Sequence, residues 1–206
     1  MVTISNGPGH LAGQQGNMFK NNIQYQTLNL KKSGCLFHQG ANIERLFFLE
    51  KGRVKLVRNT IEGQPLIIHI AYSQETFAEA SLFSDKYHCN AICDSSSIVL
   101  SFSKNEVLAY LKLHPKYTME LLKINAQQVR DLRLLNEIKS INSAYDRVWA
   151  FLLSEANQAS KLYFSYSLKD MAQKLGLAHE TFYRTLKILE QEGRIIQGEQ
   201  FIKLWD

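Results

Sequence analysis

The chain has 206 residues, 45% of them hydrophobic and 21% charged, and it carries a formal net charge of +5. A chain of this kind is an ordinary folded protein that can bury one large core or two small ones. Its longest apolar runs, such as PLIIHIA and VWAFLL, are far shorter than the roughly 18 residues of a membrane span, and no secretory signal opens it. We therefore expect a cytoplasmic protein without a membrane span.

The positive charge is not in itself evidence for a nucleic-acid partner. Residues 141–206 carry eight Lys or Arg and eight Asp or Glu, so the whole surplus lies in the first 140 residues. A prediction of DNA binding must therefore rest on where polar residues are placed.

Three cysteines, Cys35, Cys89 and Cys93, form an odd set without CxxC spacing. This pattern predicts reduced structural thiols and argues against a disulfide framework or a zinc ribbon. His88 lies beside Cys89, but its spacing to the two later cysteines matches no familiar set of metal ligands. We expect no metal site.

The N-terminal half of the chain has the pattern of a β domain. Residues 1–16 contain four glycines and no hydrophobic periodicity, so we expect a mobile leader. From about Leu28 to Ser103, short segments rich in β-branched and aromatic residues alternate with glycine turns: CLFHQG, RLFFLEKG, RVKLVRN, PLIIHIAY and SIVLSFS. Val54 and Leu56 share one face of RVKLVR. The pattern predicts an antiparallel sandwich or roll with one wet side.

After this region the periodicity becomes helical. Residues 115–140 run without an internal Pro or Gly. Their apolar stripe contains Leu122, Val129, Leu132, Leu135 and Ile138. Such a helix can pack on its own domain or pair with a second copy of the chain. We favour the dimer seam, because a lone edge helix of some seven turns rarely stays monomeric. SAYDRVWAFLLSEA predicts the next helix.

Two short helices joined by a glycine turn follow. Ser167 is a candidate N-cap, and Leu168, Met171, Ala172 and Leu175 have the i, i+3, i+4, i+7 spacing of one helix face. Gly176 ends this helix, and a second begins within a few residues. This is the plan of a helix-turn-helix, whose second helix can enter the DNA major groove.

The second helix of this pair separates apolar from polar residues. Phe182, Leu186 and Leu189 gather on one side. The opposite side holds His179, Glu180, Tyr183, Arg184 and Lys187. A guanidinium can donate to guanine O6 and N7 and a carboxylate can accept from cytosine N4, so Glu180 and Arg184 are candidates for reading a G·C step. Their i, i+4 spacing also lets them orient each other.

The alternative is a merely solvated helix face, which is the better interpretation of an isolated amphipathic helix. The capped turn before this helix and RIIQGEQFIKLW after it favour DNA binding. That last segment predicts a hairpin wing of two short strands around Gly198. Lys203 and Arg194 are candidates for phosphate contacts, although each alone is first an ordinary surface charge.

Three segments resemble the Crp/Fnr transcription regulators: LFHQGANIERLFFLEKGRVKL, SAYDRVWAFLL and LGLAHETFYRTLKILEQEGRI. The resemblance covers nearly all the chain after residue 28. It implies an α+β fold with an N-terminal cyclic-nucleotide-binding-type β-roll (a jelly roll), a long dimerisation helix and a C-terminal winged helix-turn-helix. The implied boundaries are 1–16 for the leader, 17–113 for the β-roll effector domain, 114–140 for the dimerisation helix and 141–206 for the DNA-binding domain.

The resemblance also implies roles for particular residues. Glu180 and Arg184 match the family's base-reading Glu and Arg, and His179 stands where the cyclic AMP receptor protein has another base-reading arginine. The implied DNA-binding set is His179, Glu180, Thr181, Tyr183, Arg184 and Lys187, and TTGA-like half-sites are expected. The implied dimer interface is the apolar stripe, namely Leu122, Val129, Leu132, Leu135 and Ile138.

The resemblance places an effector pocket in the roll and on the long helix. Its expected residues are Glu79, Ala80, Ser81, Cys89, Asn90, Leu135 and Asn136. Cys89 and Asn90 stand where the family's nucleotide binders have the Arg-Ser pair that holds the cyclic phosphate, and an anion without its guanidinium loses its best bidentate partner. Leu135 and Asn136 replace the adenine-contacting Thr-Ser pair. Cyclic AMP is therefore not the expected effector.

The effector itself stays open. ETFAEASLF is similar to the Dnr-type branch, whose members respond to nitrogen oxides, some through haem. The candidate axial ligands for a haem are His38, His69, His88 and His114, and the sequence singles out none of them. The cysteine spacing does not match the Fnr iron–sulfur pattern, so no cluster is expected.

We thus expect a bacterial, homodimeric, allosteric regulator that binds a pseudo-palindromic DNA site and acts with RNA polymerase. The rival is a ligand-sensing module whose C-terminal helices bind a protein partner. An enzyme is not expected, because the sequence has no Ser/His/Asp order, Walker loop or HExxH motif.

Overall fold

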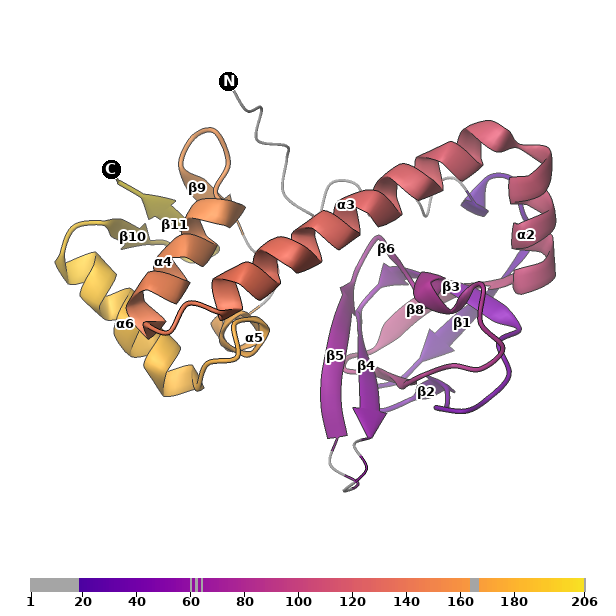
Figure 1. Ribbon diagram of the computed structural model, residues 1–206. Helices are drawn as coiled ribbons and strands as arrows, with labels where there is room; N and C mark the ends of the chain where they lie inside the picture. The colour runs from indigo at the N-terminus through magenta and orange to yellow at the C-terminus, as the bar shows by residue number, and fades with distance from the viewer. Residues whose placement is uncertain (1–18, 60, 62, 64, 164–166, 206) are drawn as a thin grey trace. The chain divides into compact units, whose positions relative to one another are not determined.

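The computed structural model describes residues 19–205 except 60, 62, 64 and 164–166, so the predicted leader, residues 1–16, lies outside the described residues. Contacts divide the chain into two compact units that meet in sequence between Ile124 and Asn125. Among the described helices, none combines the length and apolar character needed to cross a bilayer. Figure 1 gives the element labels.

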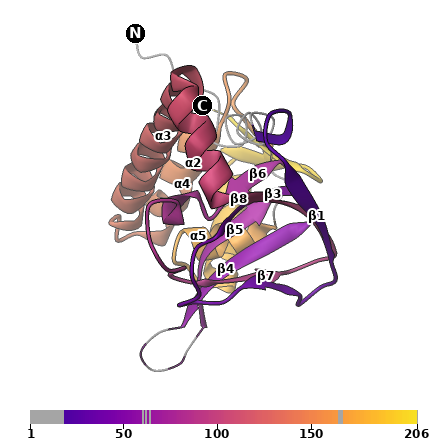
Figure 2. The same cartoon turned by 90° about the vertical axis from the view of Figure 1, so that its right-hand side faces the viewer.

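The first unit contains two four-stranded antiparallel sheets. One has the strand order β1-β8-β3-β6 and the other β2-β7-β4-β5. The strands of the first are β1 Tyr25–Leu30, β8 Ser97–Ser103, β3 Arg45–Lys51 and β6 Glu75–Phe77. Those of the second are β2 Cys35–Phe37, β7 Asn90–Cys93, β4 Arg53–Asn59 and β5 Pro65–Tyr72. The sheets face each other (Figures 1 and 2), which confirms the predicted β-roll.

The core between the sheets follows from the alternation of residues along the strands. Val54 and Leu56 of β4 are buried beside Phe47 and Leu49 of β3, whereas Lys55 is only half-buried. Stacked rings of Phe37, Phe47, Phe77 and Tyr87 fill the same space. Burial of this kind contributes about 1.5–3 kcal/mol for each large side chain. The sequence prediction missed β1, β6 and β7, since each is short or begins outside the segments it recognised.

A second core covers the outer face of the first sheet. Helix α2, Lys104–Leu113, places Val107 and Leu111 against Leu46 and Phe102 of β3 and β8. The start of α3, Pro115–Lys139, adds Leu121 to this cluster. The predicted helix over 115–140 is therefore confirmed to within one residue.

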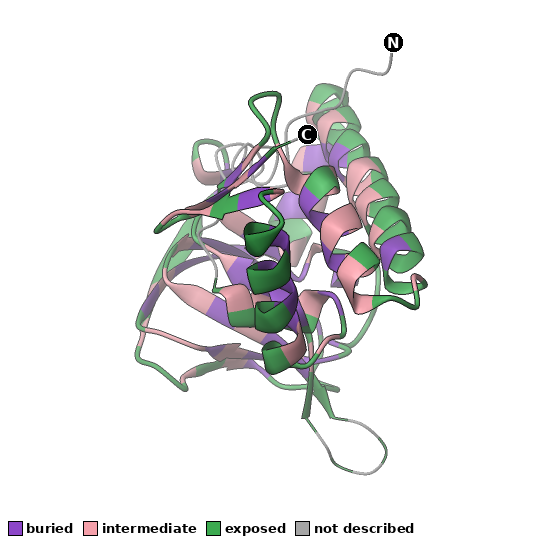
Figure 3. Ribbon diagram, turned by 90° about the vertical axis from the view of Figure 1, so that its left-hand side faces the viewer, coloured by how far each residue is buried: buried purple, intermediate pink, exposed green. Residues whose placement is uncertain are grey.

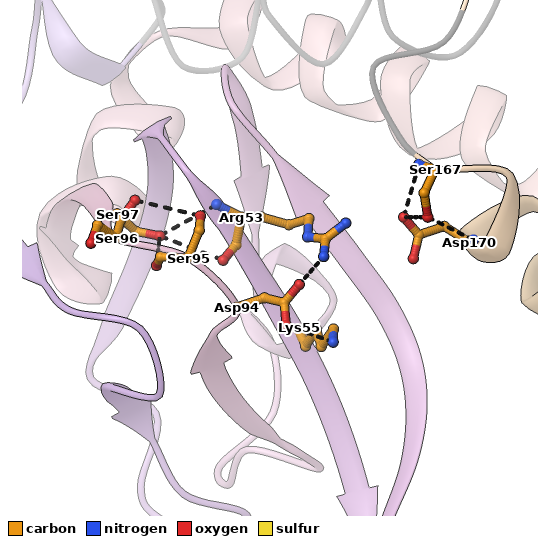
Figure 4. Close-up of polar contacts among 8 residues, drawn as sticks. All are labelled: Arg53, Lys55, Asp94, Ser95, Ser96, Ser97, Ser167 and Asp170. Atoms are coloured by element: carbon orange, nitrogen blue, oxygen red, sulfur yellow. Dashed lines mark hydrogen bonds and ion pairs between the residues drawn. The ribbon is translucent and has the colours of Figure 1, made fainter.

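One polar cluster closes the turn end of β4. The carboxylate of Asp94 pairs with the guanidinium of Arg53 and, at 2.6 Å, with the ammonium of Lys55 (Figure 4). Burial of Asp94 opposes its ionisation, but hydrogen bonds from Lys55 and Arg53 outweigh burial and hold the pKa of this carboxyl below its ordinary value. The backbone of Arg53 also bonds to the Ser97 hydroxyl.

The second unit is a winged helix-turn-helix. Its elements are α4 Ala144–Glu155, β9 Lys161–Tyr163, α5 Leu168–Lys174, α6 His179–Gln191, β10 Ile195–Gln197 and β11 Phe201–Leu204. The sheet order is β10-β11-β9, so the predicted hairpin is present together with a third strand that the sequence did not reveal. The end of α3 belongs to this unit as well, because Ile138 packs in its core.

Local sequence explains the start and the packing of α5. The hydroxyl of Ser167 accepts from the backbone N–H of Asp170, whose carboxylate accepts from the N–H of Ser167 (Figure 4). This capping box satisfies two backbone donors that a helix start leaves open. Met171, Ala172 and Leu175 are buried as predicted. Figure 3 shows buried and exposed positions alternating along the helices of this unit.

Candidate nucleic-acid interface

Helix α6 is fixed by the face it buries. Phe182, Leu186 and Leu189 are at most 1% exposed and lie in the core of the second unit. Thr185 is buried beside them, and its hydroxyl donates to the carbonyl of Thr181 at 2.8 Å. These contacts leave one side of the helix without core neighbours, so that side is available to a partner.

The available side carries the polar set that the sequence predicted. His179, Glu180, Tyr183, Arg184 and Lys187 are all exposed. Thr181, the remaining member of the predicted DNA-binding set, is half-buried. The rings of His179 and Tyr183 lie 4.3 Å apart between centroids, so they form one tilted aromatic pair at the start of the helix.

Glu180 and Arg184 do not orient each other as expected. Among the described residues neither side chain makes a hydrogen bond or an ion pair. An exposed pair at i, i+4 gains only about 0.3–0.5 kcal/mol, which does not offset the ordering of two long side chains in every case. Both groups therefore keep their donors and acceptors for a partner.

The turn before α6 has the geometry of a helix-turn-helix. Gly176 adopts φ +66°, a left-handed conformation that suits glycine, and the N–H of Leu177 donates to the carbonyl of Ala172 at 2.9 Å. Residues 175–178 thus turn the chain sharply from α5 into α6. Ala178 caps α6 without a side-chain bond, so the first N–H groups of α6 have no side-chain cap.

The two candidate phosphate ligands near the wing differ from each other. The ammonium of Lys203 lies 3.6 Å from the ring centroid of Trp205 and remains partly exposed. The guanidinium of Arg194 lies 4.0 Å from the ring centroid of Trp149 and donates to the hydroxyl of Tyr145 at 2.9 Å. Arg194 is thus held by α4, a contact that no local sequence pattern predicts.

The predicted effector position in the roll has two parts. The first is the 3-10 turn η1, Glu79–Ser81, which follows Ala78 in a left-handed conformation at φ +66°. Ser81 is buried, and its hydroxyl lies 3.3 Å from Nδ1 of His88. Ala80 is exposed and Glu79 is half-buried.

The second part, Cys89 and Asn90, is occupied by contacts within the fold. Cys89 is 2% exposed in the core between the sheets, and burial raises the pKa of its thiol to about 11 against an opposing effect of Arg58. The amide of Asn90 accepts from the N–H of Gln39 at 3.0 Å and donates to the carbonyl of Val57 at 3.3 Å. A guanidinium is thus absent from this position and the amide is already bonded.

Leu135 and Asn136, the other expected pocket residues, lie on the part of α3 that belongs to the second unit. There they line a hollow of about 400 Å³ together with Val129, Leu132, Arg133 and Lys139.

Leu122, Val129 and Leu132 of the predicted dimer seam are 58%, 45% and 64% exposed. Ile138 was predicted to belong to that seam, but it is only 4% exposed, because it packs in the core with Val148 and Phe151.

The four candidate haem ligands are all exposed and each contacts a neighbour. His38 lies 3.6 Å from the thiol of Cys35, His69 lies 4.0 Å from Glu75, and the ring of His114 lies tilted against that of Tyr110, 4.3 Å between centroids. His88 is the partner of Ser81. These surroundings do not fit an axial ligand in a closed haem pocket, and no histidine is singled out. Within the described residues, no group of His, Cys, Asp or Glu has the arrangement of a metal site.

Comparison with protein families assigns both units. Residues 27–114 match the cyclic nucleotide-binding domain, and residues 146–206 match the Crp-like helix-turn-helix domain. The chain belongs to the Crp/Fnr family. Crp/Fnr proteins are transcription regulators, so the chain combines an effector-binding domain with a DNA-binding helix-turn-helix. The predicted fold class is confirmed.

Individual Crp/Fnr relatives are distant. A cyclic AMP receptor protein of Thermus thermophilus is 26% identical over 164 residues, which are 79% of this chain and 76% of that protein. The structure of FixK2 from Bradyrhizobium japonicum matches with a TM-score of 0.68 at 18% identity, covering 89% of this chain and 94% of that one. The structure of DNR from Pseudomonas aeruginosa matches with a TM-score of 0.50 at 25% identity, covering 96% and 91%. A match to DNR among such relatives does not establish the Dnr branch.

Proposed function

We propose that this Crp/Fnr protein is a homodimer that reads a pseudo-palindromic DNA site with two copies of α6 and responds to an effector other than cyclic AMP. The observation that carries the proposal is the exposed polar face of α6, on which Glu180 and Arg184 are bonded to no other described residue. Such groups can meet base edges without first breaking a contact in the free protein.

Base readout follows from the chemistry of this face. Arg184 is the candidate for guanine and Glu180 for the cytosine of the paired strand, which agrees with TTGA-like half-sites. His179 and Tyr183 form a tilted aromatic pair next to them, and Lys187 is one turn further along α6. We assign Lys187 to a phosphate and the aromatic pair to the flank of the half-site.

The dimer is supported by the apolar residues that α3 leaves exposed. Leu122, Val129 and Leu132 lie on seven- and three-residue steps, the spacing of a helix seam between two chains. A two-fold dimer places its two reading helices about one DNA turn, roughly 34 Å, apart, which is why a pseudo-palindromic site is expected. RNA polymerase is the partner expected of such a regulator.

Cyclic AMP does not fit the roll. The phosphate of a cyclic nucleotide needs a guanidinium or several free donors, whereas Cys89 is a neutral core thiol and the amide of Asn90 is bonded to the backbone. The Thermus relative is named for cyclic AMP, and the effector proposed here differs from the ligand in that name. A Dnr-type response to nitric oxide through haem is a prediction of the resemblance, and titration of the protein with haem tests it.

The rival function is a ligand sensor whose C-terminal helices bind a protein. This rival function predicts that the chain binds DNA only weakly, without sequence preference, and that salt abolishes the binding. The match of residues 146–206 to a Crp-like helix-turn-helix favours DNA instead.

Fluorescence anisotropy with labelled duplexes tests the proposal. We expect tight binding to a palindrome of TTGA-like half-sites, weaker binding to a single half-site, and a fall of about 1–3 kcal/mol in binding free energy for Arg184→Ala at the cognate site. Arg184→Ala should also relax preference at one G·C step. Lys112→Ala, which removes an exposed cation of α2, is the matched control and should leave that preference intact. Equal affinity of the wild-type protein for all duplexes would overturn the proposal and favour the rival.

A further inference from the structure

Gly193 and Arg194 connect the DNA-reading helix to the wing, and the backbone N–H groups of both are hydrogen-bonded. After α6, Gly193 adopts φ +71° and its N–H donates to the carbonyl of Glu190 at 3.0 Å. The N–H of Arg194 donates to the carbonyl of Leu189 at 2.9 Å, and Ile195 enters the core at 1% exposure. These bonds close the helix end in the way that a glycine cap usually does. The side chain of Arg194 therefore leaves the backbone between α6 and β10.

That side chain is held by two aromatic residues of α4. Its Cζ lies 4.0 Å from the ring centroid of Trp149 and 5.9 Å from that of Tyr145, both on α4. Its Nη1 donates to the hydroxyl of Tyr145 at 2.9 Å, and this hydroxyl donates to Glu192 at 2.5 Å. Because Trp149 and Tyr145 are one helical turn apart, they form a single aromatic surface for the planar guanidinium.

The same residue also closes the open end of the wing hairpin, opposite its turn. The carbonyl of Arg194 accepts from the N–H of Trp205 at 2.8 Å, just after β11 ends. One residue thus links α4, the C-terminal end of α6 and the open end of the wing. All of these contacts lie within the second unit.

We propose that Arg194 is a positioning residue: its guanidinium, held on Trp149 and Tyr145 of α4 while its backbone is bonded to the end of α6, fixes the angle between the reading helix and the wing without touching DNA. The inference rests on the proposed function, because an angle between two DNA-contacting elements matters only if both contact DNA together. A phosphate contact, the alternative suggested by charge alone, would require the guanidinium to leave its aromatic surface.

Tryptophan emission measures the clamp without DNA. The chain has two tryptophans, so Trp205→Phe leaves Trp149 as the only one. In that background, Arg194→Lys and Arg194→Met should shift the emission of Trp149, since neither side chain presents a planar guanidinium to the indole. Tyr145→Phe keeps the aromatic surface and removes the hydrogen bonds of the hydroxyl to Arg194 and Glu192, so it should cause a smaller shift. An unchanged emission in both Arg194 variants would show that the clamp does not exist in solution.

DNA affinity as a function of salt then separates positioning from phosphate contact. We expect Arg194→Met and Arg194→Lys to weaken binding about tenfold, equally at every operator variant, because a stacked and bonded guanidinium is lost. The slope of log K against log salt should stay unchanged. A slope shallower by about 0.9 in Arg194→Met would instead identify a phosphate contact and overturn the positioning role.

One control variant and one wild-type measurement complete the test. Val148→Ala removes buried methyl groups from the same helix without touching Arg194, so it should lower stability but leave the DNA affinity of the folded protein unchanged. An equal loss of affinity in Val148→Ala would reduce Arg194 to a general contribution to folding and overturn its positioning role. If the wild-type protein bound DNA without specificity, the proposed function would fail while the emission measurement still reported on the clamp.

Discussion

The effector position of the roll and the exposed face of α6 use their polar side chains in different ways. In the roll, the side-chain amide of Asn90 accepts a hydrogen bond from one backbone group and donates one to another. Cys89 is a neutral thiol in the core. On α6, Glu180 and Arg184 contribute no bond to the fold of the described residues. Side chains that a fold has already bonded serve its stability, and those that it leaves exposed and unbonded are available to a partner.

This contrast means that the output of the regulator is easier to infer than its input. The exposed face of α6 retains a donor and an acceptor suited to a G·C step, whereas positions 89 and 90 of the roll carry no cation that would identify an anionic effector. Substitutions in the roll should therefore change folding, and substitutions on α6 should change DNA binding.

The largest effect is expected when the missing guanidinium is introduced. Cys89→Arg places a charge in the core between the sheets, close to the positive Arg58, and should lower the free energy of unfolding by about 3 kcal/mol or more. Urea unfolding measures the change, with Cys89→Ala as a control that keeps the site neutral. A Cys89→Arg variant as stable as the wild type that binds cyclic AMP would show that the roll is a nucleotide site lacking one side chain.

A smaller loss is expected at the adjacent residue. Asn90→Ala leaves the N–H of Gln39 and the carbonyl of Val57 without their partner, which should cost about 1–3 kcal/mol of stability. Asn29→Ala, at an exposed position of β1, should have little effect. The DNA affinity of folded Asn90→Ala should equal that of the wild type. A selective loss of DNA affinity would contradict the contrast and connect Asn90 to the output.

The acid response of the roll gives a third test. The pKa of Asp94 in the folded protein lies below its ordinary value of 3.8, so its stabilising effect is complete above that value and is lost as the pH falls through the folded-state pKa. Asp94→Asn should cost about 1 kcal/mol at neutral pH and progressively less in acid. Urea midpoints between pH 3 and 7 give the comparison. Glu180→Gln is the matched change on α6, and a similar acid response there would contradict the assignment of Glu180 to a partner.

Much of the fold was predictable because its signals are local. The capping box at Ser167, the glycine turn at Gly176 and the alternation of Val54 and Leu56 all lie within a few neighbouring residues. Strand β9 was missed, because three residues carry little pattern and the strand that completes it, β11, lies about 40 residues later in the chain.

The site was predictable only as far as periodicity determines exposure. Periodicity placed the polar face of α6 on the surface, but it grouped Ile138 with the seam, since a repeat shows which side of a helix is apolar and not what covers it. It also could not show that Arg194 meets Trp149, which is 45 residues away in the chain on another helix.

The smallest effect concerns the reactivity of the thiols. In the unmutated protein, this reactivity reports on access to the ligand position of the roll. Burial raises the pKa of all three thiols, yet Cys35 is exposed while Cys89 and Cys93 are in the core. Because only an accessible thiolate reacts readily, an aromatic disulfide reagent at pH 8 should label one thiol per folded chain quickly and the other two only after unfolding. Cys35→Ser should abolish the fast phase. Fast labelling of Cys89 would mean that the roll opens at its ligand position, so that an effector could reach a site that the closed roll conceals.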